Sequence, residues 1–261
     1  MEDRQERARQ MYASFANLSK SQFDLIENII QQLTRDFISV YRNPSSDIIG
    51  QCILETLGDS LRIHHCFSKE PLSKDRFEYA LERAGNLCNL DASLAPKGNP
   101  GHDLTINNQR FSLKTEASRN IKQDFIHISK FMELGKGEWD LEVLRSRYIQ
   151  HMTSYERVLI LRCLSQQSTR WHYELVEIPK PLLLEAQHGQ LRLQEKSRQT
   201  PKPGHCYIKE SDETLKYQLY FDGGTERKLQ VQHIRKSLCV VHAYWIFQTD
   251  TKLDNDSPLN S

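Results

Sequence analysis

The chain of 261 residues lacks the features that would assign it to several common protein classes. Its six cysteines show no CxxC spacing, and several lie inside apolar stretches such as QCILE and SLCVV. We therefore expect reduced and mostly buried thiols. No stretch reaches the length of a membrane span, and the polar start MEDRQERARQ lacks the apolar core of a signal peptide. These absences predict a cytoplasmic protein that does not enter a membrane.

An excess of charge of one sign is also missing. The formal net charge is only +1, so overall basicity gives no argument for binding to nucleic acid. Any such contact must come from local basic patches. Hydrophobic residues make up 38% of the chain, which is enough for a real core in one large domain, with or without an added helical segment.

The chain shows helical patterns first and strand patterns later. Apolar residues at helical spacing predict a long amphipathic helix over residues 19–40. Further helices are predicted over residues 47–60, 74–84 and 132–152, and a short one beginning at residue 179. Runs rich in strand-forming residues predict strands over residues 124–129, 156–164, 173–178, 216–221 and 229–247.

The stretch GHDLTINNQRFSLKTEAS, residues 101–118, predicts a β-hairpin. LTI and RFSLKTE are rich in strand formers, and Asn107 and Asn108 tolerate the positive φ angles of a tight turn. Because side chains alternate between the two faces of a strand, Lys114 and Glu116 share one face of the second strand.

Asp103, at the start of the partner strand, can lie beside this polar row. Asp103, Lys114 and Glu116 then bring two carboxylates and one ammonium together, which suits a divalent cation and a phosphate oxygen. The competing interpretation is an exposed hairpin with solvated charges, the commonest fate of charged residues on a strand. The apolar neighbours Ile106 and Phe111 favour a packed hairpin, in which charges need partners or a metal ion.

The hairpin resembles a known nuclease signature. Asp103 followed by SLK at residues 112–114 is similar to the PD-(D/E)xK motif, with His102 in place of its proline and Ser112 in place of its first acid. The surrounding stretches are more specific, and over residues 77–247 they resemble the SmaI-like type II restriction endonucleases in the same order. These stretches are GHDLTI, SLKTEA, SKFMELGKGEW, LVEIPK, LLLEA, PKPG, LYFDGGTERKLQ and VHAYW.

The resemblance implies an α/β (α+β) restriction-endonuclease-like core, in which helices flank a mixed central β-sheet. It also implies Mg²⁺-dependent cleavage of both strands of DNA at CCCGGG, and a cognate DNA methyltransferase acting on the same site as functional partner. We expect a helical N-terminal segment over residues 1–72 that packs on the core, a nuclease core with DNA-recognition segments over residues 73–250, and a flexible tail over residues 251–261.

The oligomeric state follows from the symmetry of the implied substrate. A palindromic duplex presents two identical half-sites, so we expect a two-fold symmetric homodimer in which each subunit cuts one strand. The amphipathic segment over residues 19–40 is a candidate for the dimer surface, and its alternative role is that of a core helix.

The second acid of the motif must come from elsewhere, since the serine of the SLK run cannot bind a metal ion as a carboxylate does. Glu116 is our candidate, because it lies on the same strand face as Lys114, about 7 Å along the strand. Glu133, expected at the start of the next helix, is its rival, because some nucleases of this broad group recruit a helical acid. Glu78, on the helix predicted over residues 74–84, is a further candidate metal ligand; alternatively, it is a solvated residue paired with Lys74 or Arg83.

These residues predict hydrolysis of a phosphodiester. Asp103 and Glu116 hold Mg²⁺, while Lys114 orients the attacking water or helps to deprotonate it. Two alternatives remain open. A DNA repair or structure-specific nuclease shares the catalytic hairpin and differs in its recognition segments, and a non-catalytic regulator binds DNA without cutting it.

A basic segment near the C-terminus is the candidate DNA-binding surface. GTERKLQVQHIRK, residues 224–236, combines basic and amide side chains on an expected strand and turn. Arginine reads guanine in the major groove, and basic side chains contact phosphates. The alternative is an edge strand guarded by charge. The predicted DNA-binding residues are Arg227, Lys228, Gln230, Gln232, His233, Arg235 and Lys236.

Overall fold

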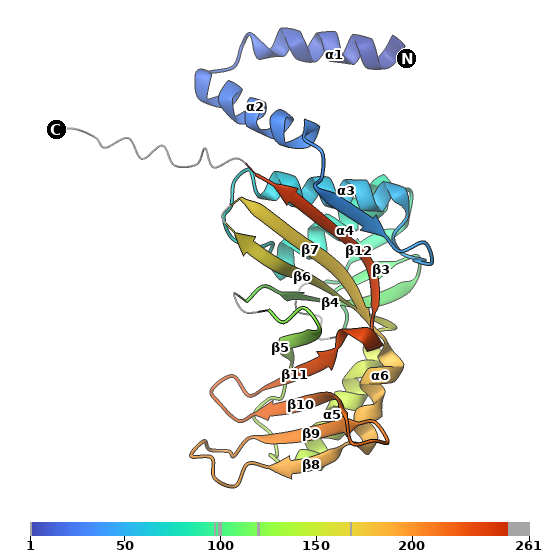
Figure 1. Ribbon diagram of the computed structural model, residues 1–261, viewed down its shortest axis with the longest axis vertical. Coiled ribbons are helices and arrows are strands. Elements are labelled where there is room, and N and C mark those ends of the chain that lie inside the picture. The colour runs from blue at the N-terminus through green and yellow to red at the C-terminus, as the bar shows by residue number, and fades with distance from the viewer. Residues whose placement is uncertain (1, 97, 99–100, 119–120, 168, 250–261) are drawn as a thin grey trace, which may run out of the picture.

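Two β-sheets form the centre of the molecule, and helices cover them (Figure 1). The computed structural model describes residues 2–96, 98, 101–118, 121–167 and 169–249. The tail expected over residues 251–261 lies outside the described part.

The larger sheet has seven strands. β4 and β6 are parallel, and the other neighbouring strands are antiparallel. The sheet is therefore mixed, as the resemblance implied. In spatial order its strands are β1 (Ser39–Arg42), β12 (Val240–Gln248), β7 (Arg170–Ile178), β6 (Arg157–Gln167), β4 (Gln109–Glu116), β3 (Leu104–Ile106) and β2 (Ala92–Leu94).

The smaller sheet has five strands, and all of its neighbouring pairs are antiparallel. Figure 1 shows its strands stacked beyond one face of the larger sheet. In spatial order its strands are β5 (Phe125–Glu133), β11 (Lys228–Arg235), β10 (Leu215–Asp222), β9 (Gly204–Lys209) and β8 (Gln190–Leu193).

Helices flank the two sheets, which confirms the predicted fold class. None of the described helices is both long and apolar enough to cross a lipid bilayer. The α-helices are α1 (Glu2–Phe15), α2 (Lys20–Thr34), α3 (Gln51–His64), α4 (Lys74–Leu87), α5 (Leu141–His151) and α6 (Lys180–Leu184), and the 3₁₀ helices are η1 (Met152–Ser154), η2 (Glu185–His188) and η3 (Lys236–Leu238).

Strand β6 contributes to two hydrophobic cores, because successive side chains of a strand point to opposite faces. Leu159 and Leu161 belong to a core that α3 and α4 share with one face of the larger sheet. Val158 and Ile160 belong to a second core, formed with α5, α6 and the apolar face of the smaller sheet. The larger sheet is therefore buried on both faces at its centre.

The predicted hairpin is confirmed. β3 and β4 pair antiparallel, with Ile106 opposite Gln109. Asn107 and Asn108 form the turn with φ angles of 46° and 65°. This is the left-handed region that asparagine tolerates better than most residues.

The helix predicted over residues 19–40 is wrong beyond Thr34. Ser19 caps α2, and Arg35 ends it in an extended conformation. The chain then enters β1, which pairs with β12 at the edge of the larger sheet. Apolar residues continue beyond the helix into β1, so periodicity alone did not show the boundary.

The helix predicted over residues 132–152 is also wrong in its first part. Met132 and Glu133 end β5, and α5 begins only at Leu141, after an N-cap in which Asp140 accepts a hydrogen bond from the N–H of Val143. Glu133 is thus a strand residue rather than a helical acid. The strand predicted over residues 229–247 is divided into β11 and β12 by η3.

The prediction that all cysteines are reduced is wrong for one pair. Cys52 on α3 and Cys88 at the C-cap of α4 form a disulfide. The two residues are 36 positions apart, so no local spacing signals the pair, and only the packing of α3 on α4 brings them together. The other four cysteines are free, and Cys239 is the one among them that is not fully buried.

Candidate active site

Asp103 is held by contacts from two neighbouring elements. Its Oδ2 atom accepts hydrogen bonds from the N–H of Leu113 at 2.6 Å and from Oγ of Ser112 at 3.4 Å. Its Oδ1 atom lies 2.7 Å from Nζ of Lys74 on α4. Burial raises the pKa of Asp103, but the ammonium groups of Lys114 and Lys74 outweigh this effect and hold the pKa below its ordinary value. Asp103 is therefore ionised at neutral pH.

Lys114 lies beside Asp103 and is only 8% exposed. Its Nζ atom donates a hydrogen bond to Oγ of Ser112 at 2.9 Å and lies 4.0 Å from Oδ2 of Asp103. Burial lowers the pKa of Lys114 to about 8, although the charge of Asp103 opposes this shift. A lysine with such a pKa is partly neutral near physiological pH and can accept a proton.

A second carboxylate is connected to Asp103 through a shared lysine. Nζ of Lys74 lies 2.7 Å from Oε1 of Glu78 and 2.7 Å from Oδ1 of Asp103. Lys74 and Glu78 are four residues apart on α4, so their side chains meet on one face of the helix. Burial lowers the pKa of Lys74, but the hydrogen bonds to the two carboxylates outweigh this effect and raise it. One ammonium thus neutralises two acids from different elements.

A cleft of about 820 Å³ opens beside these residues. Asp103, Ser112 and Lys114 line one wall, and residues 128–133 of β5 line the other, with His151 at the end of α5. The cleft therefore lies where the β3–β4 hairpin of the larger sheet meets the first strand of the smaller one. It is large enough to receive a phosphodiester group.

The donors at Asp103 and Glu78 fit a magnesium ion. Mg²⁺ prefers oxygen ligands, and one or two carboxylates commonly hold it together with water and substrate phosphate oxygens. The two carboxylates already share one cation, the ammonium of Lys74. Within the described part of the chain, no group of three or more His, Cys, Asp or Glu side chains is placed to hold a metal ion. If Mg²⁺ bound here, these two carboxylates would supply only part of its coordination shell.

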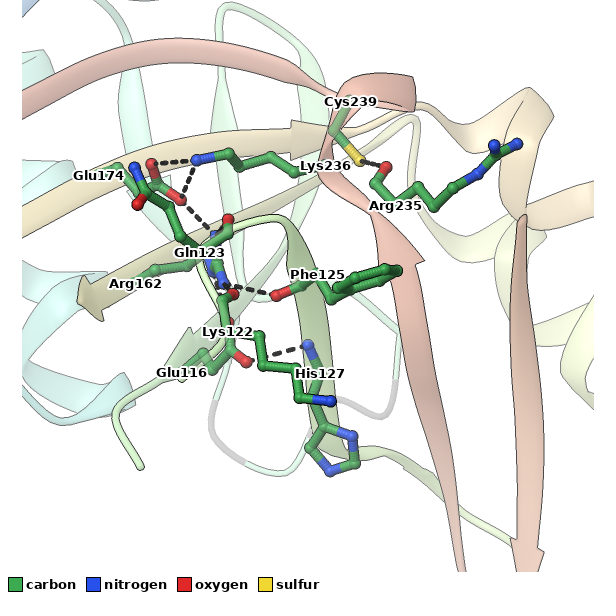
Figure 2. A network of polar contacts seen from close by, with 10 residues as sticks. All are labelled: Glu116, Lys122, Gln123, Phe125, His127, Arg162, Glu174, Arg235, Lys236 and Cys239. Carbon is green, nitrogen blue, oxygen red and sulfur yellow. Dashed lines mark hydrogen bonds and ion pairs between the residues drawn. The ribbon is translucent and has the colours of Figure 1, made fainter. Parts of the chain in front are cut away.

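Glu116 does not join this cleft. Its carboxylate lies 2.5 Å from Nε of Arg162 and accepts a hydrogen bond from the N–H of His127 at 3.0 Å (Figure 2). Burial raises the pKa of Glu116, and the Arg162 guanidinium offsets this only in part. The ion pair follows from strand pairing, because Glu116 on β4 and Arg162 on β6 are register partners.

Arg162 is completely buried and organises the network in Figure 2. It also forms an ion pair with Glu174, its register partner on β7. Its Nη2 atom donates hydrogen bonds to the carbonyl oxygens of Lys122 at 2.9 Å and Phe125 at 2.7 Å. Lys236, which follows β11, lies 3.1 Å from Glu174. The network therefore ties three strands of the larger sheet to β5 and to the end of β11.

Two comparisons with known proteins identify the family. The chain matches the SmaI family model, described as type II site-specific deoxyribonuclease, over residues 11–247. The chain belongs to the SmaI family. It is 45% identical to the type II restriction enzyme SmaI of Serratia marcescens over 213 residues, which are 81% of this chain and 86% of that protein. No solved structure matches the chain.

This SmaI-family chain is therefore a type II restriction endonuclease that acts on DNA. Its structure brings Asp103, Lys114 and Glu78 together and places Glu116 in a separate, buried network. Glu133 lines the far wall of the cleft, where its side chain is 70% exposed and lies 2.8 Å from Lys130.

The segment predicted to bind DNA forms β11 of this SmaI-family enzyme. β11 lies between β5 and β10, so the alternative of a charged edge strand is wrong. Lys228, Gln230 and Gln232 alternate with buried residues and thus point away from the core. His233 lies at a bulge with a φ angle of 57° and is exposed.

The remaining basic residues of the segment contact other side chains. The Arg227 guanidinium lies 5.6 Å from the centre of the Trp139 ring. Arg235 lies 2.5 Å from a carboxylate oxygen of Glu210, and Lys236 belongs to the Arg162 network. Arg235 and Lys236 therefore each have a structural partner in addition to any contact with DNA.

The sequence contained signals for Arg162 and Glu174, which we did not single out. Arg162 stands in the apolar strand VLILRCL, where a buried charge needs a carboxylate partner. Glu174, in the neighbouring strand YELVEI, supplies one such partner. Lys74 lies on the same helix face as Glu78, but its position beside Asp103 depends on how α4 packs against the hairpin.

We predict that Glu116→Gln mainly destabilises the fold. The change removes one of the two carboxylates that compensate the buried Arg162, so we expect the free energy of unfolding to fall by about 3 kcal/mol. Glu133→Gln is the matched control, because Glu133 is exposed and should leave the unfolding midpoint unchanged. Urea unfolding of both variants measures the difference. Equal midpoints for the Glu116 variant and the wild type would contradict a structural role.

Proposed function

We propose that the enzyme hydrolyses both strands of double-stranded DNA at CCCGGG with Mg²⁺ as cofactor. The observation that carries this proposal is the pair Asp103 and Lys114 in the cleft of a SmaI-family chain, with Glu78 connected to Asp103 through Lys74. The 45% identity to SmaI supports the same recognition sequence. Because a CCCGGG cutter would also cut the DNA of its own host, we include in the proposal a cognate methyltransferase that protects the same sites.

We assign the second acid to Glu78 in preference to Glu116 and Glu133. The carboxylate of Glu116 is committed to Arg162, and that of Glu133 lies on the far wall of the cleft. Glu78, in contrast, already shares a cation with Asp103. Asp103 and Glu78 would thus hold Mg²⁺, which supplies Lewis-acid polarisation of the scissile phosphate when bound.

The side chains of the hairpin act on the attacking water. Lys114 can donate a hydrogen bond to this water, and its lowered pKa of about 8 allows it to take up the released proton. Ser112 fixes the Lys114 side chain through its hydroxyl oxygen. Lys74 neutralises Asp103 and Glu78 before a metal ion is bound. With a metal ion held by the two carboxylates, the Lys74 ammonium would be available to balance the phosphate charge.

The proposal is tested by digestion of a sequenced plasmid with the purified protein and Mg²⁺, followed by sequencing of the fragment ends. We expect discrete fragments whose ends lie within CCCGGG. Lys114→Ala should lower the cleavage rate by about 10²- to 10⁴-fold and still bind a CCCGGG duplex, because Lys114 acts on the water and not on the bases.

Other outcomes of this digestion would overturn the proposal in distinct ways. Cuts that follow DNA structure and not sequence would indicate a repair-type nuclease. Binding without any cutting would indicate a regulator. A Lys114→Ala enzyme that cuts at the wild-type rate would remove the hairpin from the active site.

We predict that Glu78→Gln raises the Mg²⁺ concentration needed for half-maximal single-turnover cleavage by about tenfold or more, because it removes a carboxylate ligand. Glu133→Gln should leave this concentration unchanged. Titration of Mg²⁺ with both variants measures the effect. The opposite ranking of the two variants would assign the second acid to the far wall of the cleft.

We also propose a two-fold symmetric homodimer that uses α2 and β1. These elements carry large apolar side chains that are about half exposed, including Ile30 at 46% and Val40 at 45%. β1 is moreover an edge strand of the larger sheet. Exposed apolar side chains beside an open strand edge favour association with a second copy.

Sedimentation equilibrium tests this interface. The wild type should sediment as two 30.6 kDa chains with a CCCGGG duplex, and Ile30→Glu or Val40→Glu should yield single chains. Leu87→Glu is the control, because Leu87 is 58% exposed at the end of α4, outside the proposed interface. One chain per duplex that cuts both strands at once would contradict the dimer.

A further inference from the structure

The smaller sheet has one buried face and one polar face. In β10, Tyr217, Leu219 and Phe221 are buried and belong to the core shared with α5 and α6. The intervening residues Gln218 and Tyr220 are partly exposed on the opposite face. Figure 1 shows α5 and α6 together on one side of β8–β11. Among the described elements, helices thus pack on the apolar face and leave the polar face uncovered.

Strand register arranges the polar face into two rows. His205 on β9, Tyr220 on β10 and Gln230 on β11 are opposite one another and form the first row. In the second row, Gln218 lies between Tyr207 on β9 and Gln232 on β11. The six side chains are amides, phenols and an imidazole, so both rows present hydrogen-bonding groups without a carboxylate.

The three amides of this face form an oriented chain. Nε2 of Gln218 donates to Oε1 of Gln232 at 2.8 Å, and Nε2 of Gln232 donates to Oε1 of Gln230 at 2.8 Å. The chain therefore presents the acceptor Oε1 of Gln218 at one end and the donor Nε2 of Gln230 at the other. Beside it, His205 packs against Tyr220, with ring centres 4.9 Å apart. These contacts fix the side chains before any ligand arrives.

The two rows lead into the catalytic cleft. Their last strand, β11, pairs with β5, and Val231 lies opposite Ile128. The register between the two strands shifts beside Gln230, so that the β5 residues 129–131 lie opposite it; these three residues line the cleft. The polar face and the cleft that holds Lys114 are therefore continuous surfaces of one molecule.

We propose that the uncovered face of β9, β10 and β11 reads the base edges of the DNA in the major groove, with Gln218 and Tyr220 as specificity-determining residues. This inference rests on the proposed function and adds residues that lie outside the basic segment. Three strands span about 10 Å between the outer backbones, which is comparable with a major groove about 12 Å wide.

The chemistry of the face suits G·C pairs. Guanine offers the acceptors N7 and O6 to the major groove, and cytosine offers its N4 amino donor. A glutamine amide carries both a donor and an acceptor, so it can pair with either base of a G·C pair. Cations dominate contacts to phosphates, whereas the two rows consist of uncharged groups. They are therefore suited to base edges more than to the backbone.

The test measures discrimination between sequences in variants of the polar face. Wild-type enzyme first defines the site that it cuts, and single-turnover rates are then measured on that site and on duplexes with one base pair changed. For each duplex, the discrimination ratio is the rate on the wild-type site divided by the rate on the changed duplex. Gln218→Leu and Tyr220→Phe should each lower this ratio by about tenfold for a change at one or more base pairs of the site. Gln187→Leu is the control, because Gln187 is exposed in η2, on the helical side of the sheet.

A merely structural role would lower the rates on all duplexes equally and leave their ratio unchanged. An unchanged ratio in both Gln218→Leu and Tyr220→Phe would overturn the proposal. Failure of the proposed function is separately visible, since the wild type would then cut no defined sequence. If the wild type cuts a site other than CCCGGG, the duplexes are built on that site and the same ratio decides the role of the face.

Discussion

The buried guanidinium of Arg162 is the constraint on which the two-sheet arrangement depends. A charge without exposure to water must be compensated on every side, and here two carboxylates and three backbone carbonyls surround it. The carboxylates come from strands of the larger sheet, and the carbonyls come from the segment that leads into the smaller one. The electrostatic requirement of one side chain therefore fixes where β5 leaves the β3–β4 hairpin.

The same strand face of β4 serves two purposes. Lys114 opens into the cleft, whereas Glu116, two residues further on, is turned to Arg162. Lys114 lies opposite β5 across the cleft, whereas Glu116 lies beside Arg162 of β6. Proximity along a strand therefore identifies residues that share a face, but it does not show which of them share a site.

The parts of the molecule that local sequence determines could be predicted. The hairpin follows from its strand formers and from two asparagines at the turn. The motif within it singled out Asp103 and Lys114, whose side chains the structure places beside each other. The boundary between α2 and β1 could not be predicted, because one apolar pattern serves both a helix and the strand after it. The partner of Glu116 escaped prediction, since it depends on the pairing of β4 with β6. Lys74 was expected as a possible partner of Glu78, but its position beside Asp103 depends on the packing of α4.

Strand β6 contributes side chains to both hydrophobic cores, and this couples the unfolding of the two sheets. Its alternate residues, such as Leu159 and Ile160, support hydrophobic clusters on opposite sides. Loss of either cluster would expose one side of this strand and weaken its hold on the other cluster. The two sheets are thus coupled into one cooperative unit, and the polar face of the smaller sheet cannot unfold independently of the β3–β4 hairpin.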